Sequence, residues 1–369
     1  MNSSSKIYVA GDTGLVGSAI IRNLQSKGYS NFVFTPFVDY DLREQNVVRD
    51  FFETEQPDII FLAAAKVGGI IANNTYRAEF IYDNLQIQNN IIHEAYKSGT
   101  KKLVFLGSSC IYPKNSPQPM EEDHLLTSEL EYTNEPYAIA KIAGIKLIES
   151  YNLQYGTNFI AVMPTNLYGP NDNFDLEKSH VLPALLRKMH LAKALNEKNF
   201  ELIRRDFKKR PVKGFDENIS EKESEELLDD FGIRPDSVTL WGSGKPRREF
   251  LHSDDLADAC VYLAEKIDFK DIIKSDLETS EMKHPYVGKQ IRNTHINIGT
   301  GKDISIKELA ELIRDKIVNY KGKIFWDSEK PDGTYQKLMN VNKLHSLGWH
   351  DQIDFNSGIQ KVYENYIRY

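Results

Sequence analysis

Apolar and polar positions along the first half of the chain follow the pattern of a sheet whose strands are joined by helices. Short apolar runs rich in β-branched and aromatic residues are typical of buried parallel strands. Such runs begin at Lys6 (KIYVA), Asn31 (NFVFT), Asp58 (DIIFLAA), Lys102 (KLVFLG) and Asn158 (NFIAVM). Segments with helical character separate them, at Val16–Lys27, Asn46–Glu55, Tyr76–Ser98 and Tyr137–Tyr155. This alternation predicts an α/β fold with a Rossmann-type doubly wound parallel sheet, whose ligand binds beyond the carboxyl ends of the strands.

The second half of the chain has shorter elements and two strongly polar insertions, near residues 194–236 and 270–292. The first insertion contains a basic cluster followed by an acidic one: Arg204, Arg205, Lys208, Lys209 and Arg210, then Glu221 to Asp230. We expect it to be exposed and partly helical. A solvated surface is the simplest interpretation, and a lid over a substrate or partner is the alternative.

These patterns predict two domains. Residues 1–175 form a dinucleotide-binding Rossmann domain, with later segments near 240–265 as candidates to pack back on it. Residues 176–369 form a smaller C-terminal α/β substrate-binding domain that carries both insertions.

Composition narrows the class of protein. Hydrophobic residues make up 41% and charged residues 27% of the chain, as in an ordinary globular enzyme. The net charge of −7 argues against nucleic acid as the main partner, although local arginines can still hold a small anion. The two cysteines match neither a disulfide framework nor a zinc site, so no metal is expected. The start of the chain lacks an apolar signal core, and no apolar run is long enough to cross a membrane. We therefore expect a cytoplasmic enzyme.

A glycine-rich turn follows the first predicted strand. Gly11, Gly14 and Gly17 stand between that strand and the first helix, in the string GDTGLVG. Glycines in this place permit a tight turn, let a pyrophosphate approach the backbone and allow close packing of helix on sheet. Although three glycines are weak evidence alone, their position in a strand–helix unit at the N-terminus predicts a dinucleotide site.

A tyrosine and a lysine share one face of the predicted helix from Tyr137. Tyr137 and Lys141 are four residues apart, so the ammonium group can lie near the phenol and favour its ionised form. This spacing is common and usually structural. Here Ser108 stands at the end of the fourth predicted strand, where its hydroxyl can bind the same carbonyl oxygen as the phenol.

Together these elements resemble the extended short-chain dehydrogenase/reductase family, and longer strings are similar to the GDP-L-fucose synthases within it. The strings are AAAKVGGI, NNTYRAEFIYDN, FLGSSCIYPK, NEPYAIAKIAGIKL, MPTNLYGPNDNF, SHVLPALLRKMH, WGSGKPRREFLH, INIGTG and KPDGT. They span most of the chain apart from the two insertions. The resemblance implies 3,5-epimerisation and then 4-keto reduction of GDP-4-keto-6-deoxy-D-mannose, a GDP-linked keto sugar, to GDP-L-fucose.

The resemblance also assigns roles to residues. It implies that Ser108, Tyr137 and Lys141 carry out the reduction, and that Cys110 and His180 are the base and acid of epimerisation. Without it, Cys110 would be interpreted as a core residue and His180 as a surface histidine. The implied cofactor contacts are Gly11, Asp12, Thr13, Gly14, Leu15, Val16, Gly17, Asp41, Leu42, Ala63, Ala64, Ala65, Tyr137, Lys141, Pro164, Thr165, Asn166, Leu167 and His180. The implied substrate contacts are Asn166, Lys188, Trp241, Arg248 and Asp332.

The chain departs from this family where the cofactor's 2′-phosphate is expected. The family uses NADPH, and its members often carry arginines in the glycine loop and after the second strand. Thr13 and Phe37 stand there instead. NADP remains the expected cofactor and NAD is the alternative, with Arg43 as the nearest replacement cation.

Several alternatives remain open. The same fold can act on a related GDP-4-keto sugar, such as a 6-deoxy-heptose or a dideoxy sugar, with or without epimerisation. The intact Ser108, Tyr137 and Lys141 argue against a dinucleotide-binding regulator without catalysis. The strings PTNLYGP and KPDGT argue against an NAD-dependent nucleotide-sugar epimerase or dehydratase. Because the helices at Tyr76–Ser98 and Tyr137–Tyr155 carry apolar residues on more than one face, we also expect a homodimer.

Overall fold

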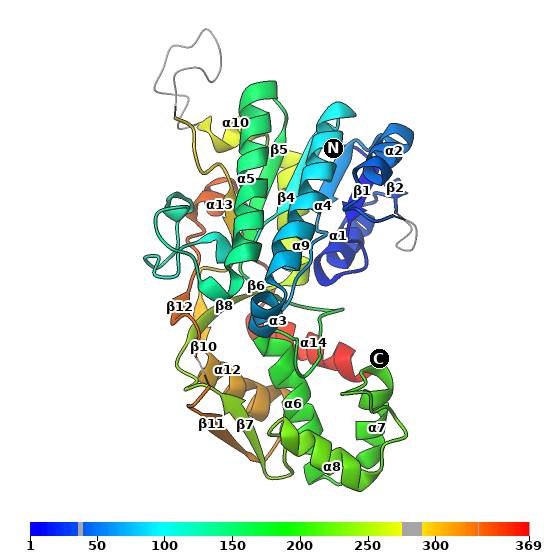
Figure 1. Cartoon of the computed structure of the whole chain (residues 1–369), viewed down its shortest axis with the longest axis vertical. Coiled ribbons are helices and arrows are strands. Elements are labelled where there is room, and N and C mark those ends of the chain that lie inside the picture. The colour runs from blue at the N-terminus through cyan, green and yellow to red at the C-terminus, as the bar shows by residue number, and fades with distance from the viewer. Residues whose placement is uncertain (36–39, 275–289, 331, 369) are drawn as a thin grey trace. The chain divides into compact units, whose positions relative to one another are not determined.

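The computed structural model describes residues 1–35, 40–274, 290–330 and 332–368 (Figure 1). The chain divides into two compact units. The first comprises Met1–Leu167, Glu249–Lys302 and Leu338–Ile353, and the second comprises Tyr168–Arg248, Asp303–Lys337 and Asp354–Tyr369. Each unit is described by itself below.

A parallel sheet forms the centre of the first unit. Its described strands have the order β2-β1-β3-β4-β5-β9, and neighbouring strands in this order pair in parallel. Their bounds are β1 Ile7–Ala10, β2 Phe32–Val33, β3 Ile59–Leu62, β4 Lys102–Leu106, β5 Phe159–Pro164 and β9 Ile296–Ile298. From β1 the chain passes first to β2 on one side and then to β3 on the other. The crevice of such a sheet therefore lies where the loops after β1 and β3 meet.

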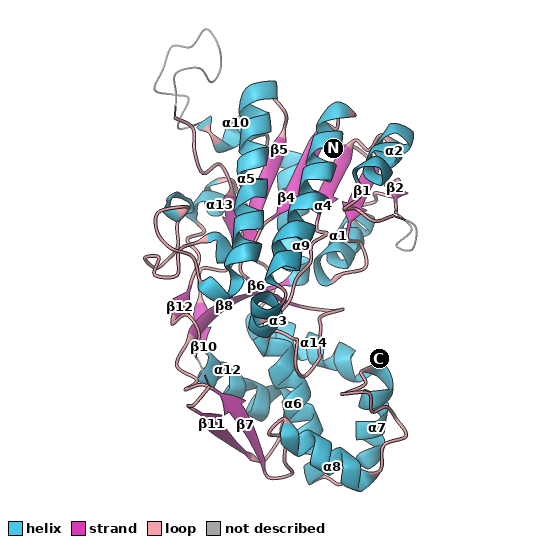
Figure 2. Cartoon of the chain, in the orientation of Figure 1, coloured by secondary structure: helices cyan, strands magenta, loops and turns pink. Residues whose placement is uncertain are grey.

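Helices cover both faces of this sheet (Figure 2). On one face, α1 (Leu15–Ser26) and α9 (Ser253–Lys266) pack against inward residues such as Ile7 and Val9. On the other, α2 (Gln45–Glu55), α4 (Arg77–Lys97) and α5 (Glu135–Tyr155) pack against Tyr8 and Ala10. Successive strand residues thus belong to opposite cores, as the alternation of side chains along a strand requires. The predicted doubly wound α/β fold is confirmed.

Short elements complete the first unit: α3 (Ile70–Thr75), η1 (Ser109–Ile111), η2 (Glu122–His124), η3 (Tyr132–Asn134), β6 (Asn166–Tyr168, which continues into the second unit), α10 (Phe269–Ile272) and α13 (Asn342–Ser346). The predicted strands and helices of the first half all form, with bounds that shift by a few residues. The largest difference is the second strand, which was expected to run from Asn31 and contains only Phe32–Val33.

The second unit combines helices with a two-stranded parallel sheet and a second small sheet, in which the strand Arg247–His252 lies between Asp303–Ser305 and Gln336–Lys337. Strand β7 (Ser237–Trp241) pairs with β11 (Lys323–Asp327), and β12 (Gln336–Lys337) pairs with Arg247 and Arg248 of β8 (Arg247–His252). The other elements are α6 (Val181–Asn196), α7 (Phe200–Lys209), α8 (Glu221–Asp230), β10 (Asp303–Ser305), α12 (Ile306–Leu312), the π-helical turn η4 (Ile313–Val318) and α14 (Phe355–Arg368).

The first polar insertion is partly helical, as expected, but it is not uniformly exposed. Helices α7 and α8 lie within it, and each is amphipathic. Ile203 and Phe207, four residues apart on one face of α7, are almost fully buried, as is Leu228 of α8. Helical spacing places these few apolar residues on one side of each helix, so a charged sequence still forms a packed unit. Residues 275–289 of the second insertion lie outside the described residues.

Across the described ranges, none of the helices combines the length and the apolar character that a membrane span requires. The same residues contain no group of three or more His, Cys, Asp or Glu side chains arranged to hold a metal ion.

Candidate functional site

The glycine loop between β1 and α1 forms a backbone cradle. Gly11 has a φ of +86°, and a Cβ there would lie 2.8 Å from the amide nitrogen of Ala64. A Cβ on Gly17 would lie 2.0 Å from the carbonyl oxygen of Gly11. A Cβ on Gly14 would meet that same oxygen alone among the described residues, at an ordinary contact distance of 3.5 Å. The outer glycines therefore permit close packing, and the middle one leaves the start of α1 open for an anionic group.

The loop after β3 forms the opposite wall of this crevice. The amide of Ala63 donates to the carbonyl oxygen of Ala10 at 3.0 Å, and Gly11 packs on Ala63 and Ala64. Thr13 and Gly14 are exposed, whereas Ala63, Ala64 and Ala65 are partly buried. The predicted contacts with a dinucleotide thus come from adjacent loops at the point where the strand order reverses, which fits a bound pyrophosphate.

Four of the predicted catalytic residues lie together at the carboxyl end of β4. Ser108 precedes the turn η1, and its hydroxyl oxygen accepts a hydrogen bond from the amide of Cys110 at 3.4 Å. The same hydroxyl hydrogen-bonds Tyr137, which lies in the first turn of α5. The Cys110 thiol is almost fully buried. It lies within electrostatic range of Tyr137 and Lys141, so a charge on the sulfur raises the pKa of both.

Lys141 is held by the end of β4. Its Nζ donates to the carbonyl oxygen of Leu106 at 2.8 Å and lies 5.8 Å from the centre of the Tyr137 ring. Burial lowers the pKa of this lysine to about 8. Burial raises the pKa of Tyr137 above its ordinary value. Near neutral pH the ammonium therefore keeps its charge and the phenol keeps its proton, which is the form that an acid needs.

The segment Pro164 to Leu167 begins at the last residue of β5 and is held by the backbone of Glu249, a residue that the sequence analysis missed. Asn166 donates to the carbonyl oxygen of Glu249 at 2.9 Å. The Glu249 side chain, fully buried, accepts hydrogen bonds from the amides of Thr300, Gly301 and Met339 at 2.6, 2.7 and 2.8 Å. Burial raises its pKa to about 7. An acidic residue within the apolar string EFLH was the available signal.

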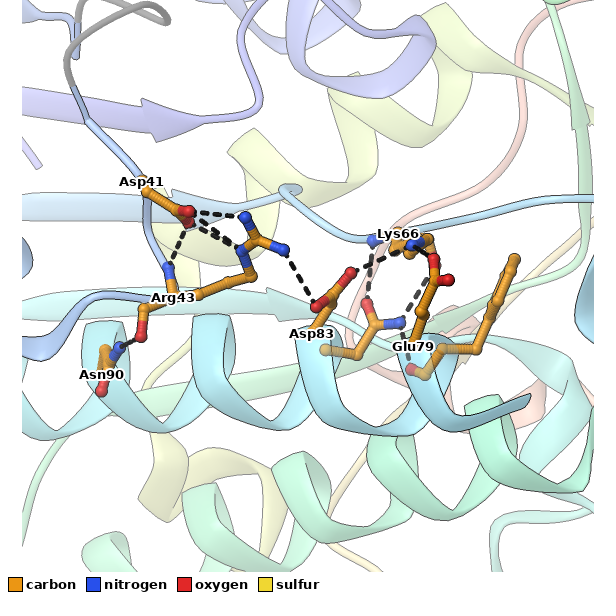
Figure 3. Close-up of polar contacts among 8 residues, drawn as sticks. Asp41, Arg43, Lys66, Glu79, Asp83 and Asn90 are labelled. Carbon is orange, nitrogen blue, oxygen red and sulfur yellow. Dashed lines mark hydrogen bonds and ion pairs between the residues drawn. The ribbon is translucent and has the colours of Figure 1, made fainter. Parts of the chain in front are cut away.

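The loop after β2 contains Asp41 and Leu42, two of the cofactor contacts that the resemblance implies. Arg43, the candidate for a 2′-phosphate contact, pairs instead with two carboxylates. Its guanidinium lies 2.6 Å from Asp41 and 3.2 Å from Asp83 of α4 (Figure 3). The sequence analysis missed Asp83, because nothing in local spacing connects positions forty residues apart. Phe37 lies outside the described residues.

The remaining predicted site residues belong to the second unit. His180 is exposed and immediately precedes α6. Lys188, in the middle of that helix, donates to the carbonyl oxygen of Phe231 at 2.8 Å, and burial lowers its pKa to about 8.

Three predicted substrate residues gather around the turn after β7. Trp241 is 58% exposed, with the Nζ of Lys330 at 5.6 Å from its ring. The Asp332 carboxylate accepts from the amide and the hydroxyl of Ser243 at 2.6 and 2.7 Å. Arg248 is partly buried, and this burial lowers its pKa, while the nearby charge of Asp332 opposes the shift. An exposed indole beside cations suits a flat base with phosphate groups.

Comparison with known proteins identifies close relatives. The chain matches the model of the NAD dependent epimerase/dehydratase family over residues 7–208 and 214–274. It is 48% identical to GDP-L-fucose synthase 1 of Arabidopsis thaliana, covering 100% of this chain and 94% of that protein. It is 46% identical to GDP-L-fucose synthase of Escherichia coli, and the match covers 98% of this chain and 96% of that protein. The crystal structure of a GDP-D-glycero-L-gluco-heptose synthase from Campylobacter jejuni in the presence of NADPH is 45% identical, with a TM-score of 0.89 and coverage of 99% of both chains.

Proposed function

Because this chain belongs to the NAD dependent epimerase/dehydratase family, and within it to the GDP-L-fucose synthases, we propose that it converts GDP-4-keto-6-deoxy-D-mannose to GDP-L-fucose with NADPH. The observation that carries the proposal is the cluster of Ser108, Cys110, Tyr137 and Lys141 beside a dinucleotide-binding crevice. A reductase needs an acid at the ketone, and an epimerase needs a base beside it. This cluster holds a candidate for each.

In the reduction, Tyr137 donates its proton to the oxygen of the 4-keto group as that carbon becomes an alcohol. NADPH, when bound in the crevice, would supply the hydride. Ser108 hydrogen-bonds the same carbonyl oxygen and holds it near the phenol. The ammonium of Lys141 then stabilises the phenolate that remains on Tyr137, at the distance already described.

In the epimerisation, a base removes a proton from carbon 3 or carbon 5, each of which flanks the ketone. The ketone makes these protons acidic, because the negative charge is shared with its oxygen. Cys110, as the thiolate, is the proposed base, and His180 is the proposed acid that returns a proton to the opposite face. The base must be a separate residue, since Tyr137 carries its proton at this stage.

Product analysis tests the proposal. The purified protein is incubated with GDP-4-keto-6-deoxy-D-mannose and NADPH, and the product is identified by NMR. GDP-L-fucose is the expected result. Reduction with no change at carbons 3 and 5 would contradict the epimerase half of the proposal, and no turnover with this sugar would contradict the substrate.

A related GDP-4-keto sugar is the second candidate substrate. It is favoured by the similarity to the heptose synthase from Campylobacter jejuni, whose identity of 45% is nearly that of the GDP-L-fucose synthases. Parallel incubations with a GDP-4-keto-6-deoxy-heptose decide between the two. The substrate with the higher kcat/KM is the one to which the second unit is adapted.

The cofactor preference follows from the charges around the crevice. Thr13 stands where family members often carry a basic residue, and Arg43 is already paired with Asp41 and Asp83. We therefore predict that the preference for NADPH over NADH is weaker than in the family generally. Competitive kinetics with both cofactors measure it. A strong preference for NADPH would show that other cations bind the 2′-phosphate.

We also propose that the enzyme is a homodimer of the cytoplasm, formed through α4 and α5. These helices pack against each other, yet Tyr82 of α4 and Ile139 and Tyr155 of α5 remain 58%, 42% and 48% exposed. Ile139→Glu is expected to convert a dimer to a monomer in light scattering, because a charge replaces apolar contact area. Ile367→Glu, at an exposed position of α14, is the matched control. A monomeric wild type at micromolar concentration would contradict the proposal.

A further inference from the structure

A cavity of about 340 Å³ lies within the second unit, lined by residues of α6, α7 and α14 and of their ends (Figure 1). Cavities of this size hold small metabolites. Its lining shares no residue with the predicted cofactor or substrate contacts. Lys188, the predicted substrate contact on α6, and His190, in the cavity wall, are two positions apart on that helix and point to nearly opposite sides. The cavity therefore lies on the other side of α6 from that contact.

Positive charge predominates in the lining of this cavity. The cationic residues are Lys193, Arg205, Lys209 and Arg210, and the carboxylates are Glu197 and Asp206. His190 adds no charge near neutral pH, because burial lowers its pKa to about 4. The lining thus has an excess of two positive charges.

The two carboxylates are already engaged by other groups. Asp206 is almost fully buried and accepts two hydrogen bonds from Arg187, at 2.9 and 2.6 Å, and one from the hydroxyl of Tyr366. Glu197 lies 4.0 Å from Lys193. Because Arg187 lies outside the lining, the charge of Asp206 is shared with a cation that does not face the cavity.

Arg210 is fixed at the cavity wall, and the protein leaves its side-chain donors open. Its guanidinium carbon lies 4.3 Å from the ring centre of Tyr366 and 5.3 Å from that of Phe174. Its Nη1 lies 3.5 Å from Asp206, but the side chain donates no hydrogen bond to any described residue. Aromatic rings hold the plane of a guanidinium without using its N–H groups. An arginine held in this way is suited to bind an oxyanion.

Two further cations line the cavity from one face of α7. Arg205 and Lys209 are four positions apart on this helix, and both are exposed. Neither side chain forms an ion pair or a hydrogen bond with the part of the chain that the structure describes. Their neighbours Arg204 and Lys208 each pair with a glutamate, at 3.9 and 3.3 Å. The cations without a protein partner are thus those that face the cavity.

We propose that this cavity is an additional ligand site, which binds a phosphate group, free or carried by a small metabolite, through Arg205, Lys209 and Arg210. A phosphate monoester carries about −1.5 to −2 charges near neutral pH, which matches the excess in the lining. Arginine can bind two phosphate oxygens at once. Leu202 and Ile367 also line the cavity and can contact the carbon part of a phosphate ester. The inference does not depend on the proposed reaction.

Calorimetric titration with inorganic phosphate and with glucose 1-phosphate tests the proposal. Excess NADPH is present, so that phosphate does not enter the cofactor crevice. The wild type is expected to show saturable binding. The double substitution Arg205→Ala with Lys209→Ala is expected to weaken it roughly tenfold or more, because hydrogen bonds to a charged group are lost. Tighter binding of glucose 1-phosphate than of phosphate would identify an ester as the ligand, and equal or weaker binding would identify the free ion.

The double substitution Arg204→Ala with Lys208→Ala is the matched control. It removes the same charges from adjacent positions of α7, but from side chains outside the cavity lining. Its affinity for phosphate should stay within about twofold of wild type, because charges away from the site act only through screened solvent. Equal losses in both double variants, or no saturable binding to the wild type, would show that α7 carries only a solvated basic surface. Circular dichroism verifies that both variants are folded. Turnover of a keto sugar does not enter the measurement, so the proposed function succeeds or fails separately.

Discussion

Replacement of Tyr137 by phenylalanine is expected to slow 4-keto reduction by roughly two orders of magnitude or more, the range for loss of a general acid. The substitution removes only the hydroxyl. The ring still packs edge-on against Phe80, whose centre lies 6.3 Å away, so the fold and the cofactor crevice should persist. The expected result is a large fall in kcat with little change in the dissociation constant of NADPH.

The measurement is the rate of NADPH oxidation with the keto sugar, together with cofactor binding by fluorescence. Tyr151→Phe is the matched control. Tyr151 lies on the same helix, and its hydroxyl bonds His93 at 2.7 Å, outside the catalytic cluster. Reduction by Tyr137→Phe at nearly the wild-type rate would show that another group supplies the proton.

Replacement of Cys110 by alanine is expected to abolish the incorporation of solvent deuterium at carbons 3 and 5. The exchange is measured by NMR in heavy water without a reducing cofactor, so that epimerisation is observed apart from reduction. Proton removal beside the ketone needs a base in the cluster, and the Cys110 thiol lies within electrostatic range of Tyr137 and Lys141. The variant should still bind NADPH and should slowly reduce the unepimerised ketone.

Cys260→Ala is the control for this experiment, because Cys260 is a fully buried core residue on α9. Its exchange should equal that of the wild type. Unchanged exchange in Cys110→Ala would mean that Cys110 only fills space. If the wild type itself shows no exchange, the protein is a 4-reductase alone and the assignment as a GDP-L-fucose synthase fails.

The sheet and its helices could be predicted because their signals are local. The apolar runs that became β1, β3, β4 and β5 needed no distant partner to be identified, since a strand buried on both faces is apolar throughout. The glycine loop could also be predicted, because its spacing between a strand and a helix is a local pattern. Its steric reasons are local at Gly17, where a Cβ would meet the Gly11 oxygen, but not at Gly11, where a Cβ would meet Ala64. The pairing of Tyr137 with Lys141 followed from helical spacing alone.

The edges of the fold were less predictable. The second strand is shorter than its apolar run, because only Phe32 and Val33 find partners on β1. In the charged stretch before Trp241, composition alone indicated exposure. The buried pair of Arg187 and Asp206, at 2.6 Å, shows that α6 and α7 pack there around an internal ion pair. Composition does not distinguish a solvated charge from one paired in the interior, since only the partner's position decides between them.

The amino-acid sequence by itself determined the fold class and the glycine loop, because each depends on spacing within one strand, turn or helix. The reductive roles of Ser108, Tyr137 and Lys141 stay predictions that rest on the resemblance to a family, since their spacing alone is common. Tertiary structure alone decided the environments of these groups. It placed Lys141 on the carbonyl oxygen of Leu106, which leaves the lysine charged but buried. It also set Arg43 between Asp41 and Asp83, which no local pattern indicated. The physical reason is that pKa values and ion pairs depend on what lies within a few ångströms, and those neighbours come from segments far apart along the chain.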